Sequence, residues 1–567
     1  MSSFTSTQYT DPDFGPNAGS IWWSDYARAS PYSLSSVASS SQWFRPEQKY
    51  AGCTLFNGIG ANDIVQGYIN DCFILSPAQA SAERDSRIDD IVVNTKYPSE
   101  GIVALNLNVK GKPAVVTVDT FLPFYYGSLP AFSRRSGDGD FWMSFLEKGF
   151  AKLHGNYESL GGGWQAETWR ILNGAPTRFI TMASINSDAN SAWNTISSAL
   201  SQGFMVGVDT ASNPPFGLVG GHAYSVLGAY SLKDSFGTVK ARLLRVRNPW
   251  GTDNYSGPWN DNDSRWTTAY KSQVPFSQNT NDGYFFIEIS DFVNTFNYFQ
   301  VNYIHDDWSQ SYYERKNDDG QWKSYTFTLP RSQDVFIGMD FYNPRMYASG
   351  CRAGQMSKGQ FNLLRGSTVL DRYAFDDRLG YGWTQYTGLA AGTYTVQVLA
   401  QWTQYDVRDY VVSVYSPDSV MVYDQSGQTS FDTPPSLLSD LQYQLTLALK
   451  DLSPYSLENG GWYTLRQGFY DSPLKNRFFL QLGGPMGVYN LDMTASFTTF
   501  DGIAVVSANA RSQTFQKVSN ADGSTTYSHN CLILPKSGIN DCSYMVYAPD
   551  ANSGVKWSWR LNSWTYA

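Results

Sequence analysis

The spacing of apolar residues changes part-way along this chain, and that change limits its fold more than any other feature. Up to about Gly203, apolar residues recur at the spacing of one helix face, as in the run from Phe141 to Phe150. After Gly203, short apolar runs are separated by Gly, Pro, Asn and Asp, which is typical of strands and turns. These runs include Phe204–Val208, Tyr224–Leu227 and Leu243–Val246. The pattern predicts an α+β protein with a helical first half and a β-rich second half.

Beyond about Asp307 the helical period is nearly absent and strict alternation replaces it. Tyr325, Phe327 and Leu329 alternate with polar residues, as in antiparallel strands with one buried face. A polar, turn-rich stretch around residues 424–435 separates two regions of this kind. We therefore expect five segments, which are an N-terminal arm packed on the core (1–48), a helical segment (49–203), a β-rich segment (204–307) and two antiparallel β-sandwich domains (308–428 and 429–567).

The charge and hydrophobicity of the chain exclude several classes of protein. Its 567 residues include 41 Lys and Arg against 50 Asp and Glu, and a net charge of -9 argues against a nucleic-acid binder. Hydrophobic residues make up 42% and charged residues 16%, which favours a folded chain. No apolar run reaches the roughly 18 residues of a membrane span, and Met1–Asp11 lacks the pattern of a signal peptide. With five cysteines, an odd number, we expect free thiols in the cytoplasm.

Two residues combine the features of a nucleophile and a base. Cys72 begins an apolar segment that we expect to be helical, and a helix N-terminus favours the thiolate form. His222 follows Gly220 and Gly221, which permit a tight turn at the start of a strand and leave the ring accessible. Considered singly, each residue is more often structural, as an inert buried thiol and a core histidine with satisfied hydrogen bonds.

Two further residues complete a set of catalytic groups. Asn248 precedes a proline, and by itself this dipeptide is only a turn signal. The order Cys72, His222, Asn248 is similar to that of papain-like proteases. In that chemistry the imidazole takes the thiol proton and the asparagine oxygen orients the ring. Gln66 precedes Cys72 by six residues, and its amide can donate to the oxyanion together with the backbone N–H of Cys72.

A series of ordered motifs between about Tyr9 and Trp308 has a parallel in one family. The motifs are Thr10–Phe14, Trp43–Glu47, Gln66–Cys72, Phe141–Leu153, Gly155–Leu160, Gly221–Val226, Arg247–Gly251, Gly257–Asp261 and Asp282–Phe285. On these motifs the sequence resembles the calpain family of intracellular cysteine proteases. The resemblance implies a papain-like core in which one lobe carries Gln66 and Cys72 and the other carries His222 and Asn248. The active site would be the cleft between the lobes.

The resemblance also describes the walls of that cleft. It places Trp250, Phe73 and Gly221 there, with Phe73 standing where a tryptophan commonly follows the nucleophile. Calpain lobes are often held apart until calcium binds each of them, and the tryptophan of the Asn-Pro-Trp motif, here Trp250, then moves out of the cleft. Calcium is therefore expected as an activator, while the chemistry itself needs no cofactor.

Candidate calcium ligands are unequal in the two lobes. In the β-rich lobe, Asp253, Asp261 and Asp282 offer the carboxylate oxygens that a hard cation requires, although acidic residues are also common on solvated surfaces. Tyr284 stands there at a position where the family usually has another acidic residue. In the helical lobe, Arg170 lies near the position where the family supplies a carboxylate, which argues against a site in that lobe.

After Trp308 the resemblance continues with Gly350–Arg352 and the alternating strands, which are similar to a calpain-type β-sandwich. The sequence has no Asp-rich loop of the EF-hand type. The layout therefore resembles the atypical calpains that lack EF-hands and end in two sandwiches.

Two functions from different classes remain open at this point. The first is an endopeptidase that performs limited proteolysis of protein substrates through Cys72, His222, Asn248 and Gln66. The second is a structural or scaffolding protein that keeps a calpain body and binds a larger protein assembly through its sandwiches. In that case surplus aromatic residues of the second sandwich would be interface anchors, for example Trp557, Trp559 and Trp564. We expect the cytoplasm as the location, with association with the cytoskeleton left open.

Overall fold

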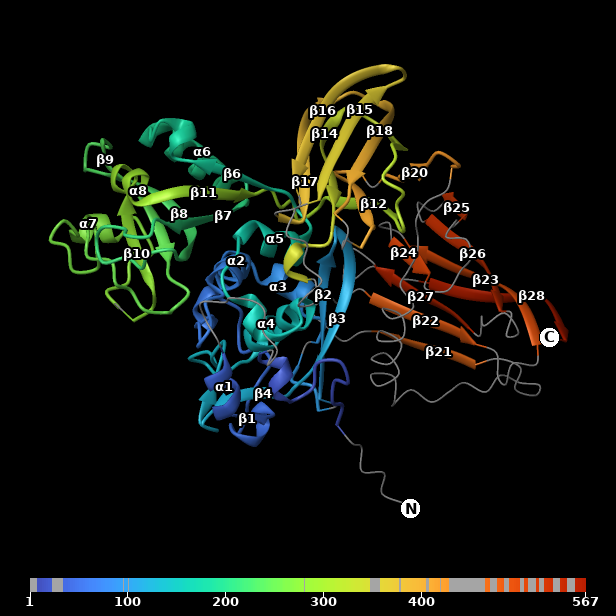
Figure 1. The fold of residues 1–567 in the computed structure, drawn as a ribbon, viewed down its shortest axis with the longest axis horizontal. Helices are drawn as coiled ribbons and strands as arrows, with labels where there is room; N and C mark the ends of the chain where they lie inside the picture. The colour runs from blue at the N-terminus through green and yellow to red at the C-terminus, as the bar shows by residue number, and fades with distance from the viewer. Residues whose placement is uncertain are drawn as a thin grey trace. The chain divides into compact units, whose positions relative to one another are not determined.

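The computed structural model describes most of the chain up to residue 427 and a series of strands beyond it. The described residues are 8–22, 34–94, 96–99, 101–279, 281–346, 357–376, 379–403, 407–418, 420–427, 464–469, 477–483, 489–499, 504–507, 516–519, 525–533, 541–547 and 556–566. Contacts divide the chain into two units, Met1–Ser430 and Phe431–Ala567. Figure 1 labels most of the helices and strands of both units.

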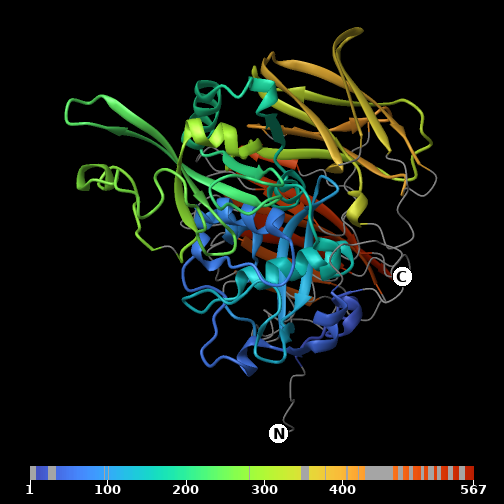
Figure 2. The same ribbon diagram turned by 60° about the vertical axis from the view of Figure 1, so that its left-hand side comes forward.

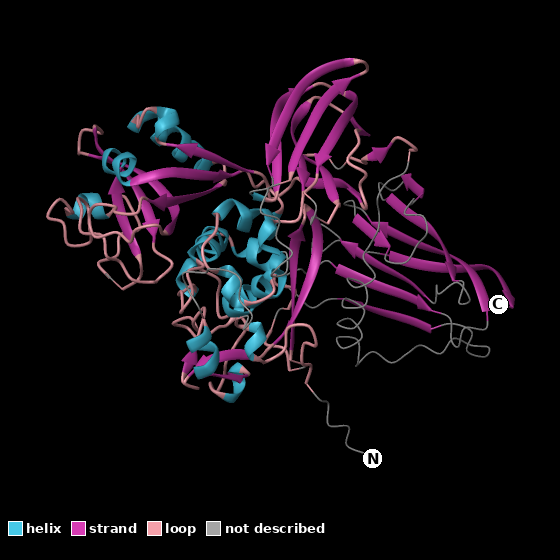
Figure 3. Ribbon diagram, viewed as in Figure 1, coloured by secondary structure: helices cyan, strands magenta, loops and turns pink. Residues whose placement is uncertain are grey.

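A group of α-helices contributes to the first hydrophobic core of the larger unit, which includes residues from Phe14 to Met205; Figure 3 shows these helices gathered together. These helices are α1 (Ser35–Ser40), α2 (Cys72–Ala82), α3 (Asp85–Ile91), α4 (Trp142–His154) and α5 (Gln165–Asn173). In α4, the apolar residues that predicted the helix are buried, and the helix ends before Gly155 at a φ of 96°. A positive φ of this kind suits glycine and stops a helix. The predicted helical run from Phe141 to Phe150 is confirmed.

The first half also contains strands that the apolar spacing did not predict. β1 (Ser41–Phe44), β4 (Leu122–Tyr125) and β5 (Leu129–Pro130) form one sheet, so part of the expected N-terminal arm is a strand. β2 (Ile102–Val109) and β3 (Lys112–Asp119) form a hairpin whose turn residues, Lys110 and Gly111, both have positive φ. The first half is therefore less helical than expected. The reason is that a short continuous apolar run such as 102–105 has the same pattern in a buried strand and in a buried helix.

A six-stranded antiparallel sheet forms the second core, which includes residues from Met182 to Val301 (Figure 2). Its order is β10 (Tyr284–Glu288), β9 (Val239–Arg247), β8 (Ala223–Lys233), β7 (Met205–Thr210), β11 (Phe296–Asn302) and β6 (Thr177–Thr181). The helices nearby are α6 (Ala189–Ser201), α7 (Thr268–Lys271) and α8 (Ile289–Thr295). The strands expected after Gly203 are confirmed as β7, β8 and β9. Because β6 and α6 also belong to this core, it begins before residue 203.

Two further antiparallel sheets share the third core, which includes residues from Tyr325 to Val422. One sheet has the order β12 (Ser309–Arg315), β19 (Tyr410–Ser416), β14 (Gln333–Asp340) and β17 (Tyr381–Leu389). The other has the order β16 (Thr368–Asp376), β15 (Lys358–Arg365), β18 (Gly392–Gln401), β13 (Lys323–Leu329) and β20 (Tyr423–Asp424). In β13 the alternating residues Tyr325, Phe327 and Leu329 are buried, as alternation predicts.

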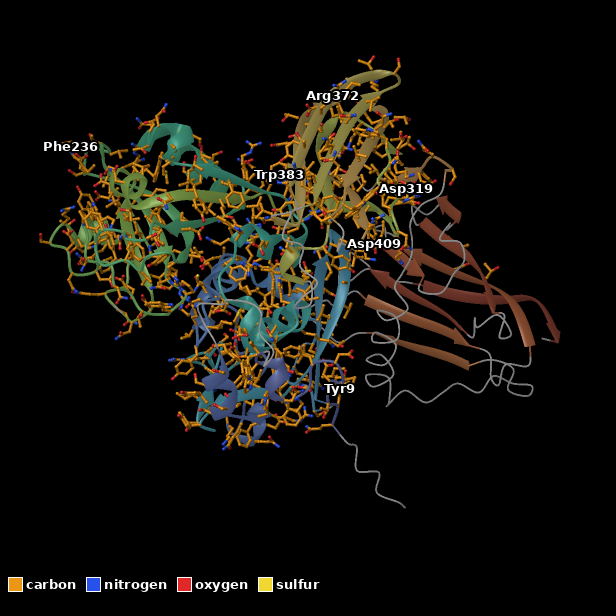
Figure 4. The ribbon with its side chains drawn as sticks, viewed as in Figure 1. Tyr9, Phe236, Asp319, Arg372, Trp383 and Asp409 are labelled. Atoms are coloured by element: carbon orange, nitrogen blue, oxygen red, sulfur yellow. The ribbon has the colours of Figure 1, made fainter. Side chains whose placement is uncertain are left out.

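Side chains of the third-core region contact both other parts of the larger unit. The indole Nε1 of Trp383 donates to the backbone oxygen of Thr177 at 3.1 Å (Figure 4). At the β2–β3 hairpin, Lys110 forms ion pairs with Glu314 at 2.8 Å and with Asp409 at 3.5 Å. The region that follows the second core is therefore joined to the rest of its unit by specific polar contacts.

The smaller unit contains two four-stranded antiparallel sheets. One sheet has the order β21 (Thr464–Phe469), β22 (Arg477–Gly483), β27 (Asp541–Tyr547) and β24 (Ala504–Ser507). The other has the order β25 (Gln516–Ser519), β26 (Thr525–Ile533), β23 (Tyr489–Thr499) and β28 (Lys556–Tyr566). The side chains of the tryptophans proposed as interface anchors, the Gly350–Arg352 motif and the expected boundary at 428 lie outside the described residues. Among the described helices, none has the length and apolar character needed to cross a membrane.

Candidate active site

Cys72 is the first residue of α2, and its side chain is buried beside the start of β8. The thiol is reached by the backbone N–H of Ala223, the residue that follows His222. Burial raises the pKa of Cys72 to about 12, and the N–H groups of Ala223 and Phe73 oppose this shift. The resting side chain is therefore a neutral thiol at physiological pH, although it occupies a helix N-terminus.

His222 is held by Asn248 through a buried hydrogen bond. The distance from Nε2 of His222 to Oδ1 of Asn248 is 2.9 Å, and the same oxygen accepts the backbone N–H of Trp250 at 3.0 Å. An amide oxygen can only accept, so Nε2 carries the ring proton and Nδ1 is left as the basic nitrogen. Burial lowers the pKa of His222 to about 4, and the bond to Asn248 opposes this shift. The imidazole is therefore neutral at rest.

Gln66 lies in the loop that leads to Cys72. Its Nε2 donates to the backbone oxygen of Ile69 at 2.6 Å, which uses one of the two amide N–H bonds. Its backbone N–H donates to the oxygen of Pro249 at 3.0 Å, next to Asn248. The following residue, Gly67, leaves no room for a side chain, because a Cβ atom there would lie 2.0 Å from the backbone oxygen of Phe132.

The expected cleft-lining residues have different surroundings. Trp250 is 39% exposed, and its ring centre lies 5.0 Å from that of His222. Gly221 has a φ of 61° and open space where a side chain would project. Phe73 instead lies in the first core at 2% exposure, with its ring against Gly163. The structure thus separates Phe73 from the exposed residues around His222.

Hydrogen bonds join the first and second cores around these residues. Oγ of Ser225 in β8 lies 2.8 Å from the backbone oxygen of Ser76 and 2.8 Å from Oε1 of Gln79 in α2, within hydrogen-bond distance of both. Arg247, which immediately precedes Asn248, donates from Nη1 to the backbone oxygen of Ile64 at 3.1 Å. The segments that carry Cys72, His222, Asn248 and Gln66 are therefore in contact with one another.

The sequence profile described as "Calpain family cysteine protease" matches residues 9–303, which is more than half of the chain. The chain belongs to the calpain family. It is 29% identical over 336 residues to the calpain-type cysteine protease DEK1 of Arabidopsis thaliana. The matched region covers 56% of this chain and 15% of that protein. It is 29% identical to Calpain-B of Drosophila melanogaster (52% of this chain, 32% of that protein) and 28% identical to the Calpain-2 catalytic subunit of Mus musculus (52% and 42%). The chain thus spans only 15% of the length of the DEK1 relative.

The acidic residues expected to bind calcium in this calpain are close but do not converge. Burial, together with the neighbouring negative charges of Asp261 and Asp282, raises the pKa of Asp253 to about 7. Burial and the charge of Asp282 raise the pKa of Asp261 to about 6. Asp253 and Asp282 each also accept a backbone N–H two residues further on. In the described residues this set does not bring three carboxylate oxygens within 4.8 Å of one another.

A different acidic group meets that condition in the part of this calpain that holds Cys72. Carboxylate oxygens of Asp63, Asp138 and Asp140 lie within 4.8 Å of one another, and Asp63 and Asp140 are buried. Burial and the charge of Asp63 raise the pKa of Asp140 to about 7. Three oxygen ligands whose charges repel one another suit a hard divalent cation.

The expectation that argued against a calcium site in the helical part of this calpain stays a prediction. That expectation depended on the positive charge of Arg170. The guanidinium of Arg170 forms an ion pair with Asp340 in β14 at 2.6 Å. The missed residues are visible one by one in the sequence, but their meeting is not. Asp138 and Asp140 flank a glycine directly before the apolar start of α4, and Asp63 precedes Gln66 by three residues.

Proposed function

We propose that this chain is a cysteine endopeptidase that performs limited proteolysis through a triad of Cys72, His222 and Asn248. One observation supports this function above all. The asparagine oxygen fixes the proton of His222 on Nε2, while the thiol of Cys72 lies against the backbone of the next residue, Ala223. A basic Nδ1 on the ring and a thiol beside it are the two partners that nucleophilic cysteine catalysis requires.

The proposed reaction begins with proton transfer from the Cys72 thiol to Nδ1 of His222. The thiolate attacks the peptide carbonyl carbon and forms a C–S bond, and the carbonyl π electrons move to oxygen. The backbone N–H of Cys72 donates to that oxyanion together with the Gln66 amide, which hydrogen-bonds Asp71 at rest and turns from it to do so. The C–N bond then breaks, and the imidazolium gives its proton to the leaving amine. Water, deprotonated by His222, cleaves the thioester and releases the acid, and the proton returns to sulfur.

The pKa values of the resting pair define what starts the reaction. With the pKa of Cys72 at about 12 and that of His222 at about 4, the pair is neutral at pH 7. Transfer of the thiol proton to the imidazole keeps the net charge of the site constant, although it separates charge in a buried place. We therefore propose that the ion pair forms when substrate or an activator changes the surroundings of the two side chains.

We propose that the two parts around the first and second cores are papain-like lobes and that the sheets beyond Trp308 form two β-sandwiches. The supporting observations are the separate cores, the contacts between α2 and β8, and the shared core of the two sheets between β12 and β20. Protein substrates follow from the reaction, and a cytoplasmic location from the composition. No observation in the described residues favours the scaffolding alternative.

We further propose that calcium modulates this protease through Asp63, Asp138 and Asp140 rather than through the predicted set in the second core. The residues present fit the ion, since they offer hard oxygen ligands that repel one another. Asp63 also precedes Gln66 by three residues in the same loop. Calcium bound there would fix the loop that supplies the oxyanion donor.

Thiol labelling tests the proposed function directly. Wild-type protein and the His222→Ala variant are treated with iodoacetamide, with and without calcium, and labelled cysteines are located by peptide mass mapping. We expect labelling of Cys72 to be faster than that of Cys53, to depend on His222 and to rise with calcium. A rate at Cys72 that does not change when His222 is replaced would rule out the triad.

A further inference from the structure

A segment that follows β14 extends from the third-core region to the helices of the first core. It includes Phe341 to Met346, where Pro344–Met346 form a short 3-10 helix. Met346 packs against the first core, and Arg345 projects its guanidinium among α5, the Tyr157–Leu160 turn and the ring of Phe73. This segment therefore reaches the residue that directly follows the proposed nucleophile.

The planar guanidinium of Arg345 contacts Glu167, Ser159 and Phe73. Its Nε lies 3.1 Å from Oε2 of Glu167, its Nη1 donates to the backbone oxygen of Ser159 at 3.5 Å, and its central carbon lies 5.4 Å from the centre of the Phe73 ring. A planar guanidinium with several N–H donors can make these contacts together, whereas a lysine ammonium cannot.

Glu167 connects this contact to the first turn of α5. Its Oε1 accepts the backbone N–H of Trp164 at 3.1 Å, and its Oε2 accepts Nδ2 of Asn343 at 3.0 Å in addition to the ion pair. The Glu167 side chain is only 2% exposed. A buried carboxylate that loses its cation is strongly destabilised, so the position of α5 depends on Arg345.

Helix α5 in turn holds the start of α2. Thr168, next to Glu167, donates from Oγ1 to the backbone oxygen of Phe73 at 2.8 Å. Arg170, two residues further along α5, is paired with Asp340 in β14. The Phe73 ring is enclosed on another side by Gly163, where a Cβ atom would lie 2.5 Å from the ring. The backbone and the ring of Phe73 are thus both fixed by groups that Arg345 and β14 support.

We propose that Arg345 is a positioning residue for the nucleophile, through which the third-core region sets the place of Cys72 relative to His222. The proposal rests on the proposed function, because it assigns Arg345 a role in that same pair. Arg345 does not touch the reacting atoms. It acts through Phe73 and Glu167, and the third-core region is then a structural part of the active site.

A double-mutant cycle measures this role. The rate of Cys72 alkylation by iodoacetamide is measured with and without the His222→Ala change, first in the wild-type background and then in the Arg345→Met background. The ratio of the two rates reports how well His222 activates the thiol and is insensitive to simple changes in access. We expect this ratio to fall at least fivefold when Arg345 is replaced.

Two further variants separate positioning from general loosening. Lys112→Met removes another ion pair between the first-core and third-core regions, the 2.6 Å contact with Glu314, far along the chain from α2. It should lower Tm and leave the alkylation ratio within twofold. Arg345→Lys keeps a charge for Glu167 and should recover Tm more fully than the ratio.

The outcomes distinguish the two proposals. If wild-type labelling does not depend on His222, the proposed function fails and the positioning role fails with it. If labelling depends on His222 and the Arg345→Met ratio equals that of wild type, only the positioning role is wrong. An equal fall of the ratio in Lys112→Met would also overturn it, because any loosening of the contact would then suffice.

Discussion

The Nε2 atom of His222 lies 2.9 Å from Oδ1 of Asn248 and is held there out of contact with bulk water. This bond determines the tautomer of the ring, because an amide oxygen cannot donate a proton. It also limits the rotation of the imidazole, since Oδ1 is itself held by the backbone N–H of Trp250. Both effects bear on how the thiol of Cys72 loses its proton.

Replacing Asn248 by alanine should therefore reduce the reaction without abolishing the fold. We expect kcat, or the His222-dependent rate of Cys72 alkylation, to fall on the order of 10²-fold, because the base His222 loses part of its contribution when its ring is no longer oriented. Asn248→Asp is the matched comparison, because it keeps an acceptor for Nε2–H. If the alanine variant reacts as fast as wild type, the orienting role of Asn248 is wrong.

Removing the ring of Trp250 should change the titration of His222. Burial lowers the pKa of His222 to about 4, and the Trp250 ring lies over it. In Trp250→Ala the imidazole gains water, so its pKa should rise toward about 6.5. The measurement is an NMR titration in a Cys72→Ala background, where the four histidines of the chain can be assigned one by one. Trp250→Phe should give a smaller rise, and no rise in either variant would contradict the covering role.

The same burial predicts a direction for stability. Between about pH 6.5 and pH 4 the unfolded chain binds a proton at His222 and the folded chain does not, so His222 makes the folded state less stable as pH falls through this window. Trp250→Ala should weaken this dependence. Denaturation in urea at a series of pH values provides the check.

Gln66 should affect the reaction more than the reactivity of the thiol. Removing its amide in Gln66→Ala takes away a donor to the oxyanion, which we expect to lower kcat about 10²-fold. Alkylation of Cys72 forms no oxyanion, so its rate should change little. Turnover of a quenched fluorescent peptide and iodoacetamide labelling, measured on the same preparation, separate the two effects. A parallel loss of both would mean that Gln66 only supports the loop.

Protonation of Asp140 should make the stability of the fold depend on pH. Its pKa is raised to about 7, so between about pH 4 and pH 7 the folded chain keeps a proton that the unfolded chain loses, and this group destabilises the fold as pH rises. In the absence of calcium, Asp140→Asn should be stabilised at pH 8 by on the order of 1 kcal/mol, after allowance for solvent screening.

Addition of calcium at pH 8 should raise the Tm of wild type and leave that of Asp140→Asn unchanged. Asp253→Asn is the matched control, because the pKa of Asp253 is also raised to about 7 but its neighbours do not converge. It should keep the calcium response. A response lost in Asp253→Asn and kept in Asp140→Asn would return the site to the second core.

The order of residue types in the sequence was enough to name the groups that the structure assembles. Cys72, His222 and Asn248 each occupy a local pattern that is visible in a few neighbouring residues, and their catalytic roles stay predictions. The strands around the second core were also predictable, because short apolar runs between turn residues are distinctive. These features depend on short stretches of chain.

Features that depend on distant segments were not predictable. Asp63 and Asp140 meet because η3 (Ala61–Asp63) and the start of α4 lie together, which no local pattern shows. Phe73 follows the nucleophile, but its burial depends on Gly163 and on Arg345 from beyond the second core. The partner of Arg170 is an aspartate 170 residues away in the chain.

The backbone hydrogen bond from Gln66 to Pro249 has a consequence for how such an enzyme is turned on and off. It ties the loop of the proposed oxyanion donor to the loop that holds Asn248 and Trp250. Separation of the two parts would break this bond and move Gln66 away from His222, whereas the hydrogen bond between His222 and Asn248 lies within the second part and would persist. Opening would therefore take away the proposed oxyanion donor and the thiol while the imidazole keeps its tautomer, so that closure alone restores the set.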